Sequence, residues 1–175
     1  SNYVPEKLFE ESGAPLDVRC GDGSCLRFSL SHAEDTTLIA LTRGKRLGVD
    51  IEKIRPVKDM QRLVAYACSD DEYSWFKRLP ARLVVETFFR LWTRKEAVVK
   101  YYRGTIAHDM NKFTVPLETA AGAFTVVPGL YEDTDELRLI DFELSANVFG
   151  SLCWDGPPTS VDIREMDCQW LESRL

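Results

Sequence analysis

The sequence has no long apolar run and no leader pattern in its first residues. No hydrophobic stretch approaches the roughly 20 residues that cross a bilayer as a helix. Residues 1–5 lack the basic and apolar regions of a signal peptide. The 175 residues, 45% hydrophobic and 29% charged, are instead typical of a globular chain that buries a substantial core. We therefore expect a cytoplasmic protein without membrane association, built as one domain or as two closely packed halves.

The cysteines show no regular spacing. The five cysteines are Cys20, Cys25, Cys68, Cys153 and Cys168. Their odd number and the lack of any Cys-x-x-Cys spacing argue against a disulfide framework and against a zinc knuckle. We interpret them as reduced thiols with mainly a packing role.

The sequence also lacks an excess of basic residues. Its net charge of −6 at pH 7 disfavours nonspecific nucleic-acid binding. The bases are nevertheless concentrated between residues 76 and 103, and we expect them to surround the functional site. This basic tract comprises Lys77, Arg78, Arg82, Arg90, Arg94, Lys95, Lys100 and Arg103. We interpret the acidic cluster at 132–136 as solvated surface.

The order of the predicted elements indicates an α+β fold. Alternating residues and turn signals predict strands first, three helices next, and further strands after them. Ser69 and Glu72 form a capping box at the start of the second helix, and Gly104 is placed to end the third. Strands followed by helices and then strands predict antiparallel sheets with packed helices. The predicted strands are 26–31, 36–41, 47–52, 113–115, 123–127, 137–144, 148–154 and 160–163, and the predicted helices are 57–67, 69–79 and 81–103.

Carboxylates and lysines stand out in one predicted strand and in the long predicted helix. Alternate side chains of a strand share a face, so Asp50 and Glu52 project the same way. Residues four apart in a helix are neighbours, which sets Glu96 beside Lys100. Oxygen ligands of this kind suit a hard cation that keeps further positions for water and phosphate. We therefore predict that Asp50, Glu52 and Glu96 bind Mg²⁺, or Mn²⁺ in its place.

Each of the two patterns also has a plainer interpretation. Asp50 and Glu52 alone are typical of a solvated strand face. Glu96 and Lys100 alone are typical of an exposed helical ion pair, which contributes about 0.3–0.5 kcal/mol. The order and separation of the two patterns favour ligation, and the apolar neighbours of Glu96 argue against full exposure.

Taken together, the two stretches are specific enough to suggest a family. Residues 47–53 and 91–100 resemble the two signature motifs of the 4′-phosphopantetheinyl transferases. Residues 28–32, Phe-Ser-Leu-Ser-His, are similar to the strand ending in Ser-His of the longer, surfactin-synthetase-type branch of that family. The resemblance extends over about residues 26–149.

The resemblance implies a fold with a pseudo-two-fold relation between halves. The first half would be a short or abbreviated unit over residues 1–46 that carries the Ser-His strand. The second half, over residues 47–175, would carry the metal motif and the long helix. The two would form one compact unit.

The resemblance also implies an activity and a set of site residues. Members of this family transfer the phosphopantetheine arm of coenzyme A to a serine of an acyl or peptidyl carrier protein. In this chain Asp50, Glu52 and Glu96 would hold the metal, and Glu96 would also act as general base. Lys100 and Lys95 would balance charge on the coenzyme phosphates or protonate the leaving group. Ser31 and His32 would contact the 3′-phosphate of coenzyme A, and the basic tract would suit docking of an acidic carrier protein.

Two other classes of function remain open from the sequence. One is a module that binds a carrier protein or coenzyme A without turnover. The other is a Mg²⁺-dependent phosphodiesterase or nuclease, which would hydrolyse nucleic acid without any need for coenzyme A. The acidic net charge and the Ser-His element count against the latter.

Overall fold

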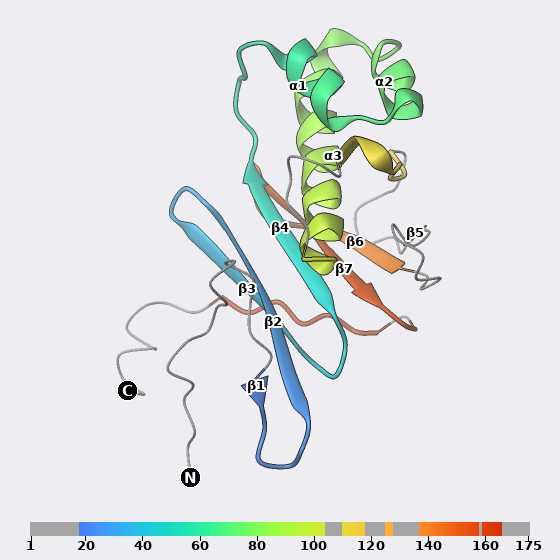
Figure 1. Cartoon of the computed structure of the whole chain (residues 1–175). Coiled ribbons are helices and arrows are strands. Elements are labelled where there is room, and N and C mark those ends of the chain that lie inside the picture. The colour runs from blue at the N-terminus through green and yellow to red at the C-terminus, as the bar shows by residue number, and fades with distance from the viewer. Residues whose placement is uncertain (1–17, 104–109, 118–124, 128–136, 158, 166–175) are drawn as a thin grey trace.

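The computed structural model describes residues 18–103, 110–117, 125–127, 137–157 and 159–165 (Figure 1). Gly104, the acidic cluster at 132–136 and Cys168 lie outside these ranges. The other four cysteines are free thiols. Within the described residues, no helix combines the length and the hydropathy that a membrane crossing requires.

The first sheet is a three-stranded antiparallel meander. It comprises β1 (Val18–Arg19), β2 (Cys25–Ala33) and β3 (Thr36–Arg43), in the order β1-β2-β3. Glu34 adopts a positive φ of 49° in the tight turn between β2 and β3. The inner face of β2 carries the small side chains Ser29, Ser31 and Ala33, which allows β2 to lie close to the strand that follows the hairpin, β4 (Leu47–Lys53).

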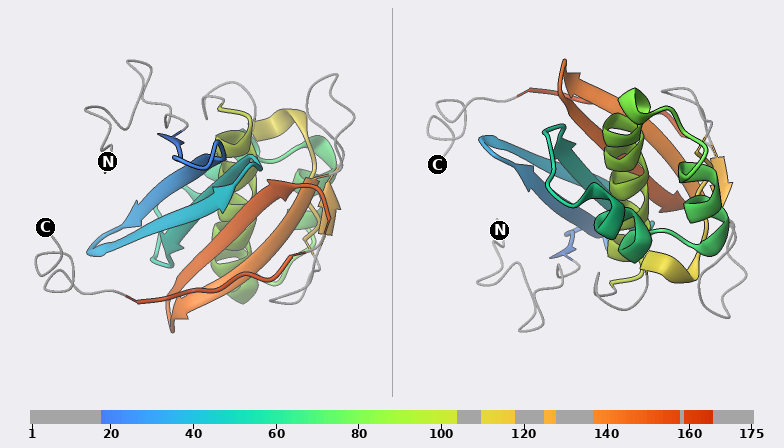
Figure 2. Two further views of the ribbon diagram at one scale, coloured as in Figure 1. Left: turned by 90° about the horizontal axis from the view of Figure 1, so that it is seen from below. Right: turned by 90° about the horizontal axis from the view of Figure 1, so that it is seen from above.

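The second sheet has four antiparallel strands in the order β4-β7-β6-β5. They are β4 (Leu47–Lys53), β5 (Thr125–Val127), β6 (Leu137–Ser145) and β7 (Val148–Asp155). The long helix α3 (Ala81–Tyr101) crosses one face of this sheet over β4 and β7, and the β2–β3 hairpin packs against β4 (Figures 1 and 2). Antiparallel sheets with packed helices confirm the α+β prediction.

The other helices gather around one end of α3 (Figure 1). They are α1 (Met60–Ala67), α2 (Asp70–Phe76) and the 3₁₀ turn η1 (Met110–Lys112). The predicted capping box is present, because Ser69 Oγ accepts the Glu72 N–H while the Glu72 carboxylate accepts the Ser69 N–H. The main hydrophobic core lies between these helices and the α3 face of the second sheet.

Two predicted strands are wrong. Residues 113–115 form no ladder, because their backbone groups bind side chains instead: Phe113 O accepts a bond from Lys95, and Val115 N–H donates to Glu72. Residues 160–163 are exposed and unpaired with any described strand. Their alternating pattern is typical of a strand, but only a backbone ladder defines one. The division into halves at residue 46 and their pseudo-two-fold relation stay predictions.

Gly48 sets the distance between β4 and α3. A Cβ atom at this position would lie 2.0 Å from Ala97 O and 2.4 Å from Tyr101 N, both backbone atoms of α3. Neither atom belongs to a flexible side chain, so any larger residue must push the helix from the strand. The glycine therefore permits the close approach that brings the side chains of β4 and α3 together.

We expect Gly48→Ala to lower the free energy of unfolding by about 3 kcal/mol, the upper end of the usual cost of overpacking. Urea unfolding monitored by circular dichroism would measure it. Gly21→Ala is the matched control, since a Cβ atom at Gly21 would meet no other atom within 4 Å and the φ of Gly21 lies outside the left-handed region. Equal stability of the two variants would contradict the close packing described here.

Candidate active site

Strand β4 turns two carboxylates toward α3. The strand alternation that places Gly48 against the helix puts Asp50 and Glu52 on the same side. Asp50 is buried, and Lys100 of α3 donates from Nζ to Asp50 Oδ1 at 2.8 Å. The same lysine amine lies 3.4 Å from the backbone oxygen of Leu30 in β2. Lys100 therefore joins the helix to both sheets at this point.

Glu96 lies one helical turn before Lys100 and is only 3% exposed. The pKa of the Glu96 carboxyl is raised to about 8, mainly by burial and also by the negative charges of Asp50 and Glu52, whereas Lys100 opposes the change. Two of these causes are other carboxylates, which shows that the structure brings the three acids into one electrostatic cluster.

The pKa values of the other two carboxyls are also raised. For Asp50 the main cause is burial, opposed by Lys100 and by the hydroxyl of Ser31. For Glu52 burial comes first and Asp50 second, opposed by Arg55, by Lys100 and by a hydrogen bond from Trp92. Burial thus opposes ionisation of all three acids, the charge of Asp50 opposes that of Glu52 and Glu96 as well, and a positive ion between them would relieve that repulsion.

Two oxygen atoms of this acid cluster fit a cation. Asp50 Oδ2 and Glu96 Oε2 are buried and have no hydrogen-bond partner among the described residues. A buried carboxylate oxygen without a donor is costly, and a hard cation is one of the few groups that compensates it. Within the described ranges, however, no three His, Cys, Asp or Glu side chains are already arranged as a metal centre.

Ser31 and His32 point to opposite faces of β2. Ser31 is buried toward β4, where its hydroxyl donates to Asp50 Oδ1 at 2.8 Å and accepts the Ile51 N–H at 3.2 Å. His32 is exposed on the other face. The structure therefore brings Ser31 to the acid cluster but does not bring the two residues to one side of the strand.

Lys95 does not reach the acid cluster. Its Nζ forms a fully buried ion pair with Glu72 Oε2 at 2.6 Å and donates to the backbone oxygens of Met110 and Phe113, each at 2.6 Å. Burial lowers the pKa of Lys95, and the Glu72 carboxylate opposes that shift. All three ammonium protons have an acceptor, so this lysine ties α3 to α2, to η1 and to the segment after η1.

The Arg94 side chain is likewise buried and paired inside the protein. Its guanidinium binds the Asp141 carboxylate of β6 and the backbone oxygen of Pro116. Asp141 also accepts a bond from Ser151, whose hydroxyl contacts that of Thr93 at 3.0 Å. Arg94 and Lys95 therefore stabilise the fold and are not part of a basic surface.

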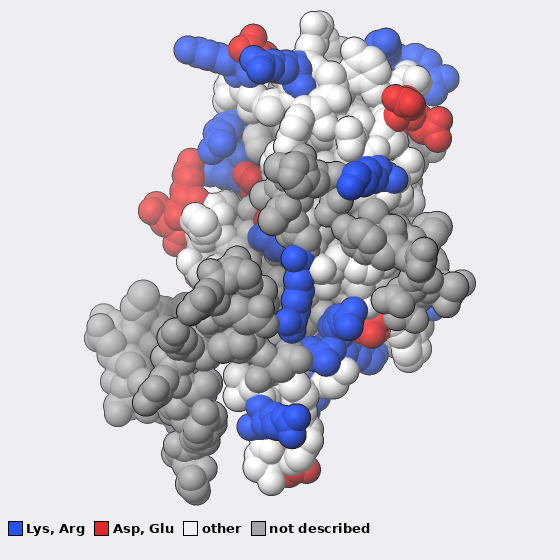
Figure 3. Space-filling view, viewed as in Figure 1, with Lys and Arg blue, Asp and Glu red and all other residues white. Residues whose placement is uncertain are grey.

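The remaining members of the basic tract lie at or near the surface. These are Lys77, Arg78, Arg82, Arg90, Lys100 and Arg103. Figure 3 shows Lys and Arg side chains along the middle of one face, with acidic side chains near the tip of the β2–β3 hairpin. Lys100 contacts the acid cluster, and the expectation that the other exposed bases surround the site stays a prediction.

Three contacts of the site region escape sequence reasoning. The apolar pattern of α3 assigns Trp92 to the core, yet Trp92 also lowers the pKa of the Glu52 carboxyl. The capping box explains Glu72 as a helix cap alone, yet Glu72 also neutralises Lys95. Arg55, just after β4, adds a positive charge near Glu52. Only Arg55 carries a signal in the sequence, namely its position three residues after Glu52.

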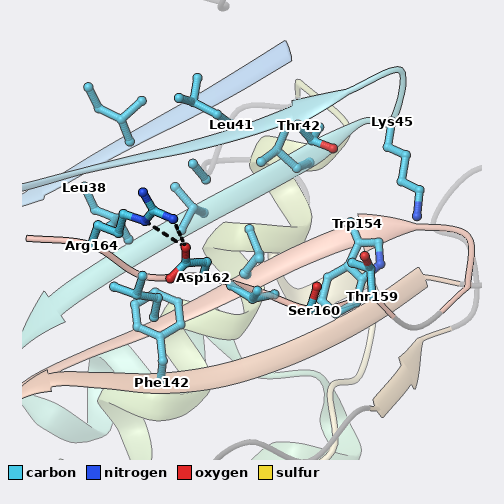
Figure 4. Close-up of a pocket in the computed structure, with 17 residues that line it drawn as sticks. Leu38, Leu41, Thr42, Lys45, Phe142, Trp154, Thr159, Ser160, Asp162 and Arg164 are labelled. Carbon is cyan, nitrogen blue, oxygen red and sulfur yellow. Dashed lines mark hydrogen bonds and ion pairs between the residues drawn. The ribbon is translucent and has the colours of Figure 1, made fainter. Parts of the chain in front are cut away.

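A pocket of about 450 Å³ lies elsewhere, against the other face of β4 (Figure 4). Leu47 and Val49 line it, and strand alternation turns both away from Asp50. Its wall also includes the exposed ion pair of Asp162 and Arg164. This pocket is therefore separate from the acid cluster.

Comparison with known proteins gives consistent similarities. A family model described as the 4′-phosphopantetheinyl transferase superfamily matches residues 46–150. The 4′-phosphopantetheinyl transferase HetI of Nostoc sp. is 35% identical over 92 residues, which cover 53% of this chain and 39% of HetI. The transferase AcpT of Salmonella typhi is 34% identical over 102 residues, covering 58% of this chain and 52% of AcpT. The transferase psf-1 of Bacillus pumilus is 28% identical over 149 residues, covering 85% of this chain and 61% of psf-1. The chain spans about half the length of the curated relatives it matches.

Proposed function

Because this chain belongs to the 4′-phosphopantetheinyl transferase superfamily, we propose that it transfers the phosphopantetheine arm of coenzyme A to a serine of an acyl or peptidyl carrier protein in the cytoplasm. The observation that carries the proposal is the acid cluster with Lys100, where the two motif stretches meet. In this reaction the serine oxygen bonds to the phosphorus that bears the pantetheine arm. The bond from that phosphorus to the bridging oxygen breaks, and adenosine 3′,5′-bisphosphate leaves with the electron pair.

Glu96 is the proposed general base. The Glu96 carboxylate belongs to the acid cluster, and its oxygen that does not hold the cation would accept the serine proton. An aliphatic hydroxyl is a weak nucleophile until its proton has an acceptor.

Asp50, Glu52 and Glu96 are the residues that would hold Mg²⁺, or Mn²⁺ in its place. The unpartnered oxygens of Asp50 and Glu96 and the mutual repulsion of the three acids support this assignment. When bound, the ion neutralises the pyrophosphate and stabilises charge on the departing oxygen.

Lys100 and the surface bases would bind the substrates. The Lys100 side chain is 30% exposed, so its ammonium group contacts Asp50 and still reaches the edge of the site, where it would meet the coenzyme phosphates. His32 is exposed at the end of β2 and is available as a donor to the 3′-phosphate. The exposed bases suit an acidic carrier protein.

Incubation with coenzyme A, Mg²⁺ and an apo carrier protein tests the proposal. We expect the carrier protein to gain the mass of one phosphopantetheine arm on its serine, measured by mass spectrometry. An unchanged carrier mass would contradict the proposed transfer.

A binding module without turnover is the second candidate. Lys100 and the exposed bases would serve this candidate in the same way, because holding the coenzyme phosphates or an acidic carrier protein needs no proton transfer. Calorimetry separates the two candidates, because heat of binding to coenzyme A or to the carrier protein without mass gain would indicate the module.

Removal of divalent cations is expected to stop the transfer. Excess EDTA should reduce mass gain on the carrier protein to background, and added Mg²⁺ should restore it, because the acid cluster would repel the pyrophosphate without a cation. A rate that is unaffected by the chelator would remove the acid cluster from the mechanism.

A further inference from the structure

The hydroxyl of Ser31 already donates one hydrogen bond and accepts another. It donates its single proton to Asp50 Oδ1 at 2.8 Å, and its oxygen accepts the backbone N–H of Ile51 at 3.2 Å. The residue is only 5% exposed. Phosphate oxygens accept hydrogen bonds, and a serine hydroxyl has a single proton to donate. Ser31 would therefore have to release Asp50 before it could donate to a phosphate.

The two oxygens of Asp50 differ in their surroundings. Oδ1 accepts from Ser31 of β2 and from Lys100 of α3, both at 2.8 Å. Oδ2 is buried with no hydrogen-bond partner among the described residues. Two donors from different elements therefore fix the orientation of the carboxylate and leave the other oxygen available.

We propose that Ser31 is a positioning residue whose hydroxyl holds Asp50 Oδ1 so that Oδ2 would be free to bind the cation, and that this hydroxyl does not donate to the coenzyme. This inference rests on the proposed function, because it assumes that Asp50 is a metal ligand. It replaces the phosphate contact that the Ser-His pattern predicts for Ser31 and leaves that role to His32. Outer hydrogen bonds of this kind commonly change metal affinity about 10- to 100-fold.

Ser29 provides a matched control two residues earlier on the same face of β2. It is 4% exposed, and its hydroxyl accepts the Val49 N–H of β4 at 3.1 Å. Its contact to β4 is thus the same as that of Ser31, except that no bond from Ser29 to a carboxylate is present in the described structure. A substitution at Ser29 removes the contact between strands without disturbing Asp50.

The experiment compares Ser31→Ala, Ser31→Cys and Ser29→Ala with the unaltered chain. Calorimetric titration with Mg²⁺, checked by electron paramagnetic resonance with Mn²⁺, measures cation affinity without turnover. The ratio of KM for coenzyme A to KM for 3′-dephospho-coenzyme A measures contact with the 3′-phosphate. Ser31→Cys nearly keeps the size of the side chain but offers only a weak hydrogen-bond donor. It therefore tests the same inference if Ser31→Ala does not fold.

We expect Ser31→Ala and Ser31→Cys to weaken cation binding by about 10-fold or more, with the KM ratio unchanged. The cation affinity of Ser29→Ala should stay within about twofold of that of the unaltered chain, because this change leaves the metal ligands in place. Equal cation affinity in the Ser31 and Ser29 variants would overturn the inference. So would a Ser31 variant that loses its preference for coenzyme A while binding Mg²⁺ normally. Failure of the unaltered chain to bind any divalent cation would instead overturn the proposed metal site, and the inference with it.

Discussion

Replacing Glu96 with glutamine is expected to lower the rate of phosphopantetheine transfer about 1,000-fold, within the range that a general base contributes. Glutamine has nearly the same size and fits the same buried position, but its amide neither accepts the serine proton nor offers a negative oxygen. The rate is measured as mass gain on the carrier protein at saturating coenzyme A. Circular dichroism of the variant should match that of the unaltered chain.

Glu86→Gln on the same helix is the control for this substitution. Glu86 is exposed and forms an ordinary i,i+4 ion pair with Arg90, so its loss should leave transfer unchanged. If Glu96→Gln retained transfer within a few-fold of the unaltered chain, Glu96 could not be the base. An equal loss in both variants would point to a general effect on the helix.

Replacing Lys95 with methionine is expected to lower the free energy of unfolding by about 3–5 kcal/mol. This is a large share of the roughly 5–15 kcal/mol that stabilises a typical domain. The substitution leaves the Glu72 carboxylate buried without its cation and deprives the backbone oxygens of Met110 and Phe113 of a donor. Urea unfolding monitored by tryptophan fluorescence would measure the loss.

Two further variants separate the buried charge from the lost hydrogen bonds. Adding Glu72→Gln to Lys95→Met should recover part of the stability, because no unpaired charge then remains in the core. Lys58→Met, at an exposed lysine, should change the free energy of unfolding by less than about 0.5 kcal/mol. A Lys95→Met variant as stable as Lys58→Met would show that the buried ion pair contributes little.

Much of the fold could be predicted because the elements around the site have strong local patterns. The alternation in β2, β3 and β4 and the uninterrupted helix formers of α3 are visible without any tertiary information. Residues 113–115 could not be assigned correctly, because the acceptors and donors of their backbone are side chains far away in the sequence. Local propensity does not carry such information.

The site could be predicted in part for a similar reason. Spacing alone places Asp50 with Glu52 and Glu96 with Lys100, and the structure brings these four side chains into one electrostatic cluster. Consecutive helical residues point about 100° apart, so Lys95 could not have shared the direction of Glu96. What no spacing reveals is the partner that holds Lys95 in the core.

The pair Ser31 and His32 shows the limit of a motif as a guide. The two residues are adjacent in sequence, and the motif assigns them one ligand. The alternation of β2 places them on opposite faces, and only Ser31 meets the acid cluster. The direction of each side chain therefore has to be considered before a shared role is assigned.

The contact between the β2–β3 hairpin and β4 also affects the tendency of this chain to aggregate at high protein concentration. β4 is an outer strand of its sheet, and two of its amides, those of Val49 and Ile51, are bound by serine hydroxyls. Unpaired backbone N–H groups on an edge strand can pair with strands of other molecules, and such pairing leads to aggregation. Ser29 and Ser31 each bind one of these N–H groups without adding a strand to the sheet. The two contacts therefore protect the apolar strand β4 from self-association.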